Sequence, residues 1–103
     1  MAQIIYAESA LKDIEHIKDY ISADSISNAN KFILAIDKKI DTLEKYPEIG
    51  KPVFPDKYNG LRQLLHKSYR IIYHYDKDVV TVVTIHHQAR LLENVNPIKD
   101  YTK

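Results

Sequence analysis

The chain has 103 residues, of which 45% are hydrophobic and 28% charged, and it contains no cysteine. This length is sufficient for one domain with a single core of two packed layers, so residues 1–103 are treated as one domain. The missing cysteine excludes a disulfide scaffold, a zinc–thiolate site and a cysteine nucleophile. No apolar run approaches the ~20 residues that span a bilayer, and the N-terminus does not have the pattern of a signal peptide. We therefore expect a cytoplasmic domain without membrane contact.

Charge is divided unevenly along the chain, although the formal net charge is only +1. Residues 1–50 carry six lysines against nine carboxylates, whereas residues 51–103 carry nine lysines and arginines against five carboxylates. The imbalance favours an anionic partner for the second half, and it is equally compatible with a chance distribution of solvated charge.

The first half of the chain predicts a short strand followed by two amphipathic helices. Gln3–Tyr6 is apolar and β-prone, and a helical stripe begins after Glu8 and breaks at Ser22–Ser25. Ser25 or Ser27 is expected to cap a second helix, which Pro47 ends. The apolar stripes are Leu11, Ile14, Ile17 and Ile21 in the first helix and Ala29, Phe32, Ile33, Ile36, Ile40 and Leu43 in the second.

The second half predicts strands. Residues 47–60 form a loop that contains both glycines and three of the four prolines. Tight turns then separate three β-prone segments, Leu61–His66, Tyr69–Tyr75 and Val79–His87. The expected fold class is α+β, a helical hairpin packed on one face of a small antiparallel sheet of three or four strands. The other face is expected to stay open, and the tail after Arg90 is expected to form about one helical turn.

A group of cations with interleaved tyrosines is the main candidate for function. Strand alternation places Arg70 and His74 on one side of their strand, and we expect Arg62 to share that surface. Such a cluster is suited to RNA, because cations meet phosphates and rings stack on bases. It suits an acidic or amphipathic partner peptide equally well. The members are Arg62, His66, Lys67, Arg70, His74, His86 or His87, and Arg90.

Metal and cofactor sites are not expected. His86 and His87 are adjacent in a strand, so their side chains point to opposite faces and do not hold one metal ion together. With two glycines in the chain, a glycine-rich phosphate loop is absent. A metal-free ribonuclease would need a base, a cation for the phosphorane and an acid, which histidine and arginine can supply.

The order of these segments resembles the RelE/ParE superfamily of toxins from type II toxin–antitoxin modules, and the resemblance covers nearly the whole chain. It rests on Ala7–Leu11 and Ile14–Tyr20, on LEKYPEIGKP at Leu43–Pro52, on LRQLLHKSYRIIYHY at Leu61–Tyr75 and on VVTVVTIHHQARLL at Val79–Leu92. The resemblance implies the helical hairpin and small sheet described above.

The superfamily divides by target, and this sequence resembles the ParE-like branch more closely. RelE-like members cut messenger RNA, mostly on the ribosome, whereas ParE-like members inhibit DNA gyrase. Arg70 matches a basic residue that RelE-type enzymes use on the scissile phosphate, and Arg62 and Arg90 fall near two other cations. The second lysine of those enzymes falls near Leu64, and their catalytic tyrosine falls near Asn96. If the chain is a ribonuclease, the resemblance makes Arg62, Arg70, His86, His87 and Arg90 the catalytic candidates.

The resemblance also implies a protein partner. A cognate antitoxin is expected to cover exposed apolar and basic surface with an amphipathic helix or an added strand. The candidates for binding the target or the antitoxin are Arg62, His66, Lys67, Arg70, His74 and Arg90. A homodimer or a toxin–antitoxin hetero-oligomer is compatible with the sequence. A third interpretation is an inactive relative that only binds its antitoxin as a corepressor. No cofactor is expected in any of these cases.

Overall fold

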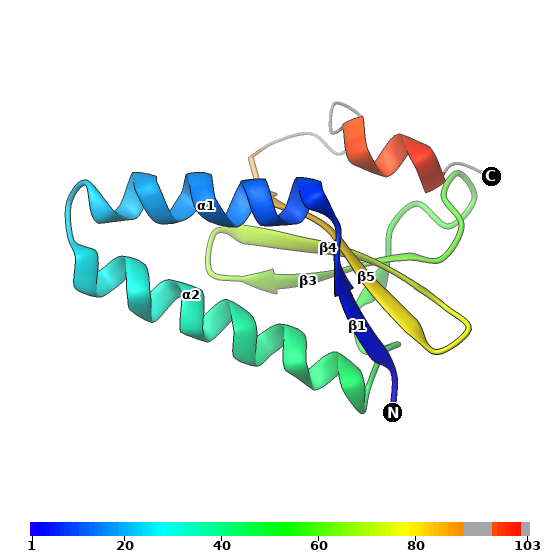
Figure 1. The fold of residues 1–103 in the computed structure, drawn as a ribbon. Coiled ribbons are helices and arrows are strands. Elements are labelled where there is room, and N and C mark those ends of the chain that lie inside the picture. The colour runs from blue at the N-terminus through cyan, green and yellow to red at the C-terminus, as the bar shows by residue number, and fades with distance from the viewer. Residues whose placement is uncertain (90–95, 102–103) are drawn as a thin grey trace.

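The computed structural model describes residues 1–89 and 96–101 (Figure 1). Two helices lie on one side of a twisted sheet, and the last element packs against the other side. The elements in chain order are β1 (Gln3–Tyr6), α1 (Glu8–Ser22), α2 (Ile26–Asp41), η1 (Thr42–Glu44), β2 (Lys51–Pro52), β3 (Leu61–His66), β4 (Tyr69–Asp76), β5 (Val79–His87) and η3 (Asn96–Tyr101).

The sheet has five strands in the order β1-β5-β4-β3-β2. The predicted α+β class and the helical hairpin on a small sheet are confirmed. The sheet differs from the prediction in having five strands instead of three or four, and in being mixed instead of antiparallel. Strand β1 pairs with β5 in parallel, while the other neighbours are antiparallel. The extra strand is β2, which lies inside the predicted loop 47–60. It escapes a pattern search because it has only two residues, one of them a proline at the sheet edge.

Helix α1 begins and ends where predicted, whereas α2 ends at Asp41, six residues before Pro47, and Leu43 of its predicted stripe lies in the 3-10 helix η1. Ser25, not Ser27, caps α2, because its hydroxyl accepts a hydrogen bond from the Asn28 backbone N–H at 3.2 Å. No helix among residues 1–89 and 96–101 is long and apolar enough to cross a membrane.

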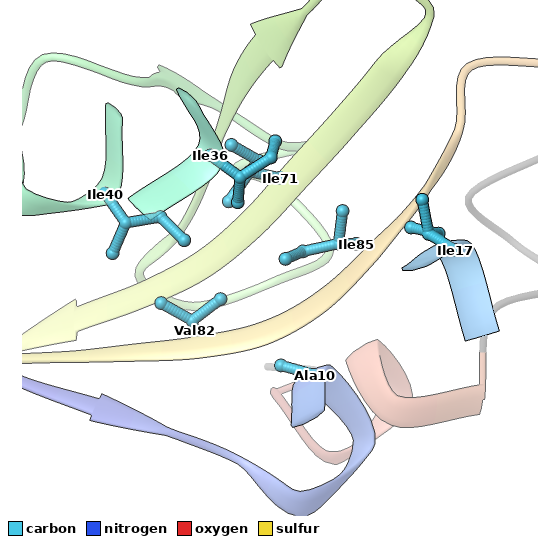
Figure 2. Close-up of a cluster of buried hydrophobic side chains, with 7 residues drawn as sticks. All are labelled: Ala10, Ile17, Ile36, Ile40, Ile71, Val82 and Ile85. Atoms are coloured by element: carbon cyan, nitrogen blue, oxygen red, sulfur yellow. The ribbon is translucent and has the colours of Figure 1, made fainter. Parts of the chain in front are cut away.

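The main core lies between the helices and the sheet (Figure 2). Its buried members come from α1, α2, β4 and β5, and each faces the space between the two layers. They are Ala10, Ile17, Ile36, Ile40, Ile71, Val82 and Ile85. Ile17, Ile36 and Ile40 belong to the predicted helical stripes, and Ala10 lies one position from a stripe residue. Ile71 belongs to the apolar side of the second predicted strand.

A second core covers part of the opposite sheet face, so the prediction that this face stays open is wrong there. Ile72 and Val83 point to this side, and the loop after β2 contributes Val53 and Tyr58. Ile98 of η3 is fully buried in the same cluster. The prediction failed because the cover comes from two irregular segments, which have no periodicity to reveal a buried side.

A β-bulge interrupts β5 at Val83. Ile72 of β4 lies opposite Thr84, but the next residue, Tyr73, lies opposite Val82, so Val83 is an extra residue. As a result Val82 and Ile85 both face the helices, although they are three residues apart. Every side chain after the bulge therefore lies on the face opposite to the one that strict alternation from Val79 would give it.

Candidate functional site

The predicted cations lie on both faces of the sheet. Residues that lie directly opposite each other in an antiparallel pair share a face. Arg62 is opposite Tyr73, on the helix side, whereas Arg70 is opposite His86, on the other side. The prediction that Arg62 shares a surface with Arg70 and His74 is therefore wrong. Alternation within β4 was read correctly, but the register of β3 against β4 was not available from the sequence.

Arg62 is engaged in holding the loop before β2. Its Nη1 donates hydrogen bonds to the carbonyl oxygens of Glu48 and Gly50, at 3.0 and 2.8 Å. Its Nη2 lies 3.7 Å from a carboxylate oxygen of Glu48. These contacts consume much of the donor capacity of the guanidinium, so its role in this structure is to fix the loop.

Tyr73 holds the same loop from the core. Its hydroxyl donates to the carbonyl of Pro47 at 2.7 Å and accepts from the backbone N–H of Gly50 at 2.9 Å. Burial raises the pKa of Tyr73, and the Gly50 hydrogen bond and Arg62 oppose this only partly. Gly50 permits the approach, because a Cβ there would lie 2.6 Å from the hydroxyl oxygen.

Arg70 and His86 lie directly opposite each other on neighbouring strands, on the sheet face away from the helices. Arg70 donates from Nη2 to the carbonyl of Gln88 at 3.1 Å. Its Nε is buried without a hydrogen-bond partner among the described residues. The imidazole of His86 belongs to a residue that is only 4% exposed. A phosphate that approaches this face would therefore meet the partly exposed Arg70 before His86.

His74 is packed under the loop that precedes β3. Its ring lies 4.6 Å from the ring of Tyr101, measured between centroids. A Cβ on Gly60 would meet His74 Nε2 at 2.9 Å. His74 therefore lies toward the end of β4 that is away from the β3–β4 turn. It is opposite Leu61, on the same sheet face as the second core. Arg90 lies outside the described residues.

His66, Lys67 and His87 lie at the β3–β4 end of the sheet on the helix side. The ring of Phe32 from α2 contacts His66 and Tyr69 edge-on, at centroid distances of 5.8 and 5.0 Å. Burial lowers the pKa of His66, and the positive charges of Lys39 and Lys67 lower it further. His87 is exposed, and its ring lies 5.7 Å from that of Tyr69.

A groove beside this aromatic group escaped the sequence-based interpretation. It lies between α2 and the β3–β4 turn and has a volume of about 340 Å³. We call it the α2–turn groove; its lining residues are Ile21, Asn28, Lys31, Phe32, Ala35 and Lys67. Lys31 looked like ordinary solvated charge in the sequence, because nothing local indicates that α2 meets the turn near Lys67.

The described residues contain no group of three or more His, Asp or Glu side chains placed to hold a metal ion. The described cationic candidates occupy four separate places: Arg62 at the loop before β2, the Arg70–His86 pair, His74 beside Tyr101, and the β3–β4 end of the sheet. Surfaces of this kind bind a partner through spread contacts more readily than they perform acid–base chemistry at one atom.

Comparison with known proteins places the chain among toxins. A family model described as "ParE toxin of type II toxin-antitoxin system, parDE" matches residues 4–92. The curated protein Toxin RelE2 of Caulobacter vibrioides is 35% identical over 92 residues, which cover 88% of this chain and all of that protein.

Two solved structures share the fold. The chromosomal ParDE system of P. aeruginosa aligns with a TM-score of 0.71 and 18% identity, over 84% of this chain and 96% of that one. The toxin–antitoxin complex RelBE2 of Mycobacterium tuberculosis aligns with a TM-score of 0.57 and 17% identity, over 86% and 93% of the two chains. With the helical hairpin, the five-stranded sheet and the family match over residues 4–92, this chain belongs to the ParE toxin family of type II toxin–antitoxin systems, within the RelE/ParE superfamily.

Proposed function

We propose that the chain is a ParE-like toxin that acts in the cytoplasm by inhibiting DNA gyrase and is neutralised by a cognate antitoxin. The family match over residues 4–92 carries this proposal. The geometry of the described cations supports it, because they are distributed as contacts and do not converge on one point.

A ribonuclease mechanism makes a stricter demand on geometry. The base, the cation and the acid must all reach one phosphodiester. Arg62 is bonded to the carbonyls of Glu48 and Gly50, and His74 is packed against Tyr101. Arg62 lies on the opposite face of the sheet from Arg70, and His74 lies four residues further along the same strand. Of the described candidates only His86 lies beside Arg70, and His86 is nearly inaccessible.

RelE-like cleavage of messenger RNA is the second candidate, and one specific observation favours it. The 35% identical relative carries the name Toxin RelE2. In that case Arg70 would meet the scissile phosphate, and His86 would have to become accessible on the ribosome. A corepressor without its own target is the third candidate, and it would be inert toward both gyrase and ribosomes.

The test compares two purified systems with the same protein preparation. In one, DNA gyrase relaxes or supercoils a plasmid in the presence of the chain; in the other, ribosomes translate a message that is then read by primer extension. Loss of supercoiling with an intact message supports the proposal. Codon-phased cuts with normal supercoiling overturn it in favour of the ribonuclease.

The Arg70→Ala variant serves as the control in both systems. It should weaken whichever effect is real, while antitoxin added at equal concentration should abolish it. Inactivity of the wild-type chain in both systems would contradict the toxin proposal and favour the corepressor.

A further inference from the structure

The α2–turn groove has an apolar floor that is held in place by neighbouring rings. Figure 1 shows the β3–β4 turn beside α2, where the groove lies. Ile21, Phe32 and Ala35 are partly buried and supply the floor. Phe32 is fixed by its edge-on contacts with His66 and Tyr69. A floor that is already ordered loses little conformational entropy when an apolar side chain enters.

The rim of the groove is positively charged. Two of the described lining residues are lysines, Lys31 and Lys67, and none is a carboxylate. Lys39 stands nearby, with its Nζ bonded to the carbonyl of Leu65 in the adjacent strand. The lowered pKa of His66 has the positive charges of Lys39 and Lys67 among its causes, which is consistent with a positive potential at this end of the sheet.

Lys67 lies in the β3–β4 turn, which Gln88, the residue directly after β5, holds through two hydrogen bonds. The φ of Lys67 is +53°, in the left-handed region where glycine is the favoured residue. The side-chain amide of Gln88 donates to the Lys67 carbonyl at 2.8 Å, and the Gln88 backbone N–H donates to the Ser68 carbonyl at 2.8 Å. These two hydrogen bonds order the turn from which the Lys67 side chain reaches the groove.

The apolar surface continues along α2. A neighbouring depression shares Lys31 and Ala35 with the groove and adds Leu34, which is 65% exposed. Its other lining residues are Asp37, Lys38 and Asp41, so carboxylates of the partner are expected only at the end of the surface near Lys31 and Lys67. An exposed leucine beside an apolar floor extends the surface over more than one helical turn. A partner segment would therefore have room for several side chains.

We propose that the α2–turn groove receives a segment of the antitoxin in which an aliphatic side chain is flanked by carboxylates. The aliphatic group fills the floor over Phe32 and Ala35, and the carboxylates meet Lys31 and Lys67. The inference rests on the proposed function in one respect, that an antitoxin binds this chain. A nucleic acid fits the groove less well, because most of the floor is aliphatic and its phenyl ring is already packed against two other rings.

Charge reversal tests the rim. The purified chain and the purified product of the neighbouring gene, as the antitoxin, are compared by biolayer interferometry at several salt concentrations. Lys31→Glu and Lys67→Glu should each weaken binding about tenfold, because they replace an attraction by a repulsion. The double variant should also lose most of the salt dependence that the wild-type chain shows.

Lys77→Glu is the matched control. Lys77 also occupies a hairpin turn at positive φ, +50°, but in the β4–β5 turn at the opposite end of the sheet. The backbone strain of the substitution is therefore the same, while the groove is untouched. Its dissociation constant should stay within about twofold of the wild-type value.

A unique thiol tests the floor, because the chain has no cysteine. Ala35→Cys should react with a maleimide in the free chain and become protected in the complex, as read by mass spectrometry. Lys77→Cys should stay reactive in both states. If Ala35→Cys does not fold, the charge-reversal series still decides the proposal.

The outcomes separate the two proposals. A complex that forms with wild-type affinity in the Lys31→Glu and Lys67→Glu variants overturns the groove assignment and leaves the antitoxin partner intact. If no complex forms with any variant or with the wild-type chain, both the antitoxin partner and the groove assignment are overturned. Protection of the thiol of the Ala35→Cys variant by a single-stranded RNA oligonucleotide, without protection by the antitoxin, would overturn the proposal and assign the groove to nucleic acid.

Discussion

Asp13 on helix α1 accepts, on its carboxylate oxygen Oδ2, the hydrogen bond that the backbone N–H of Ile85 donates at 3.0 Å. The same oxygen accepts from the hydroxyl of Thr84, and Ser9, one helical turn earlier, donates to the carbonyl of Val83. Four residues of helix rise about 6 Å and two residues of strand about 6.6 Å, so the two spacings match. Side chains of α1 thus provide hydrogen-bond partners for backbone groups of β5 beyond Val82, the last residue of β5 that pairs with β1.

Asp13→Ala is expected to destabilise the fold by about 2 kcal/mol, because it leaves a backbone donor and a buried hydroxyl without their acceptor. Asp13→Asn is the matched variant, since its amide oxygen still accepts from both groups. Urea denaturation of the two variants should therefore separate them clearly. Equal stability of the alanine and asparagine variants would show that the contact with β5 contributes little.

Tyr73→Phe is expected to lower stability by about 2 kcal/mol, because the carbonyl of Pro47 and the N–H of Gly50 both lose their partner. Tyr75→Phe, on the same strand and the same face, removes only an exposed hydroxyl contact with Asp78. It should remain within about 0.5 kcal/mol of the wild-type chain. The measurement is the midpoint of urea unfolding for both variants, and a similar loss in both would argue against the loop contacts of Tyr73.

Stability should fall as the pH drops through the normal range of histidine titration, in part because of His66. Burial and the lysines 39 and 67 lower the pKa of His66 in the folded state. The unfolded chain therefore takes up a proton first, near pH 6.5, and acid favours unfolding. Above that range both states are neutral at this site, so the full contribution to stability is present.

His66→Gln should flatten the pH dependence of the unfolding free energy between about pH 7.5 and 5. The remaining histidines give the wild-type and variant chains the same background. Curves that run parallel over this range would show that the pKa of His66 is not lowered in the folded protein.

Arg62→Ala should mainly lower stability, whereas Arg70→Ala should mainly lower toxicity. Loss of Arg62 removes two charged hydrogen bonds to the β2 loop and should cost about 1–2 kcal/mol. Loss of Arg70 removes a single hydrogen bond, to the carbonyl of Gln88, and should therefore cost less stability than loss of Arg62. It should weaken growth inhibition about tenfold, as expected for a charged contact at a binding surface. Growth curves at matched expression, read beside thermal unfolding, distinguish the two; full toxicity of Arg70→Ala would remove Arg70 from the target-binding surface.

Much of the fold was predictable from periodicity. The two apolar stripes, with Ile17 in α1 and Ile36 and Ile40 in α2, indicated which sides of the helices are buried, and these residues lie in the main core. The break at Ser25 indicated the turn between the helices. Such patterns are local, so one sequence is enough to read them.

The candidate site was less predictable, because it depends on register and on irregular segments. Arg62 and Arg70 looked equivalent until the pairing of β3 with β4 placed them on opposite faces. The bulge at Val83 has no marker such as glycine, and the residues that accommodate it, Ser9 and Asp13, lie more than seventy positions away. Long-range relationships of this kind need either a structure or many related sequences.

The pairing of Gln3 with Val79 joins two strands that are separated by more than seventy residues of sequence. Strand β1 pairs only with β5 among the described strands, so the sheet closes only after the residues up to Val82 have been synthesised. Non-local pairing of this type also slows folding. A newly made toxin molecule would thus spend its synthesis, and a short time afterwards, in a form that does not yet present the finished surface.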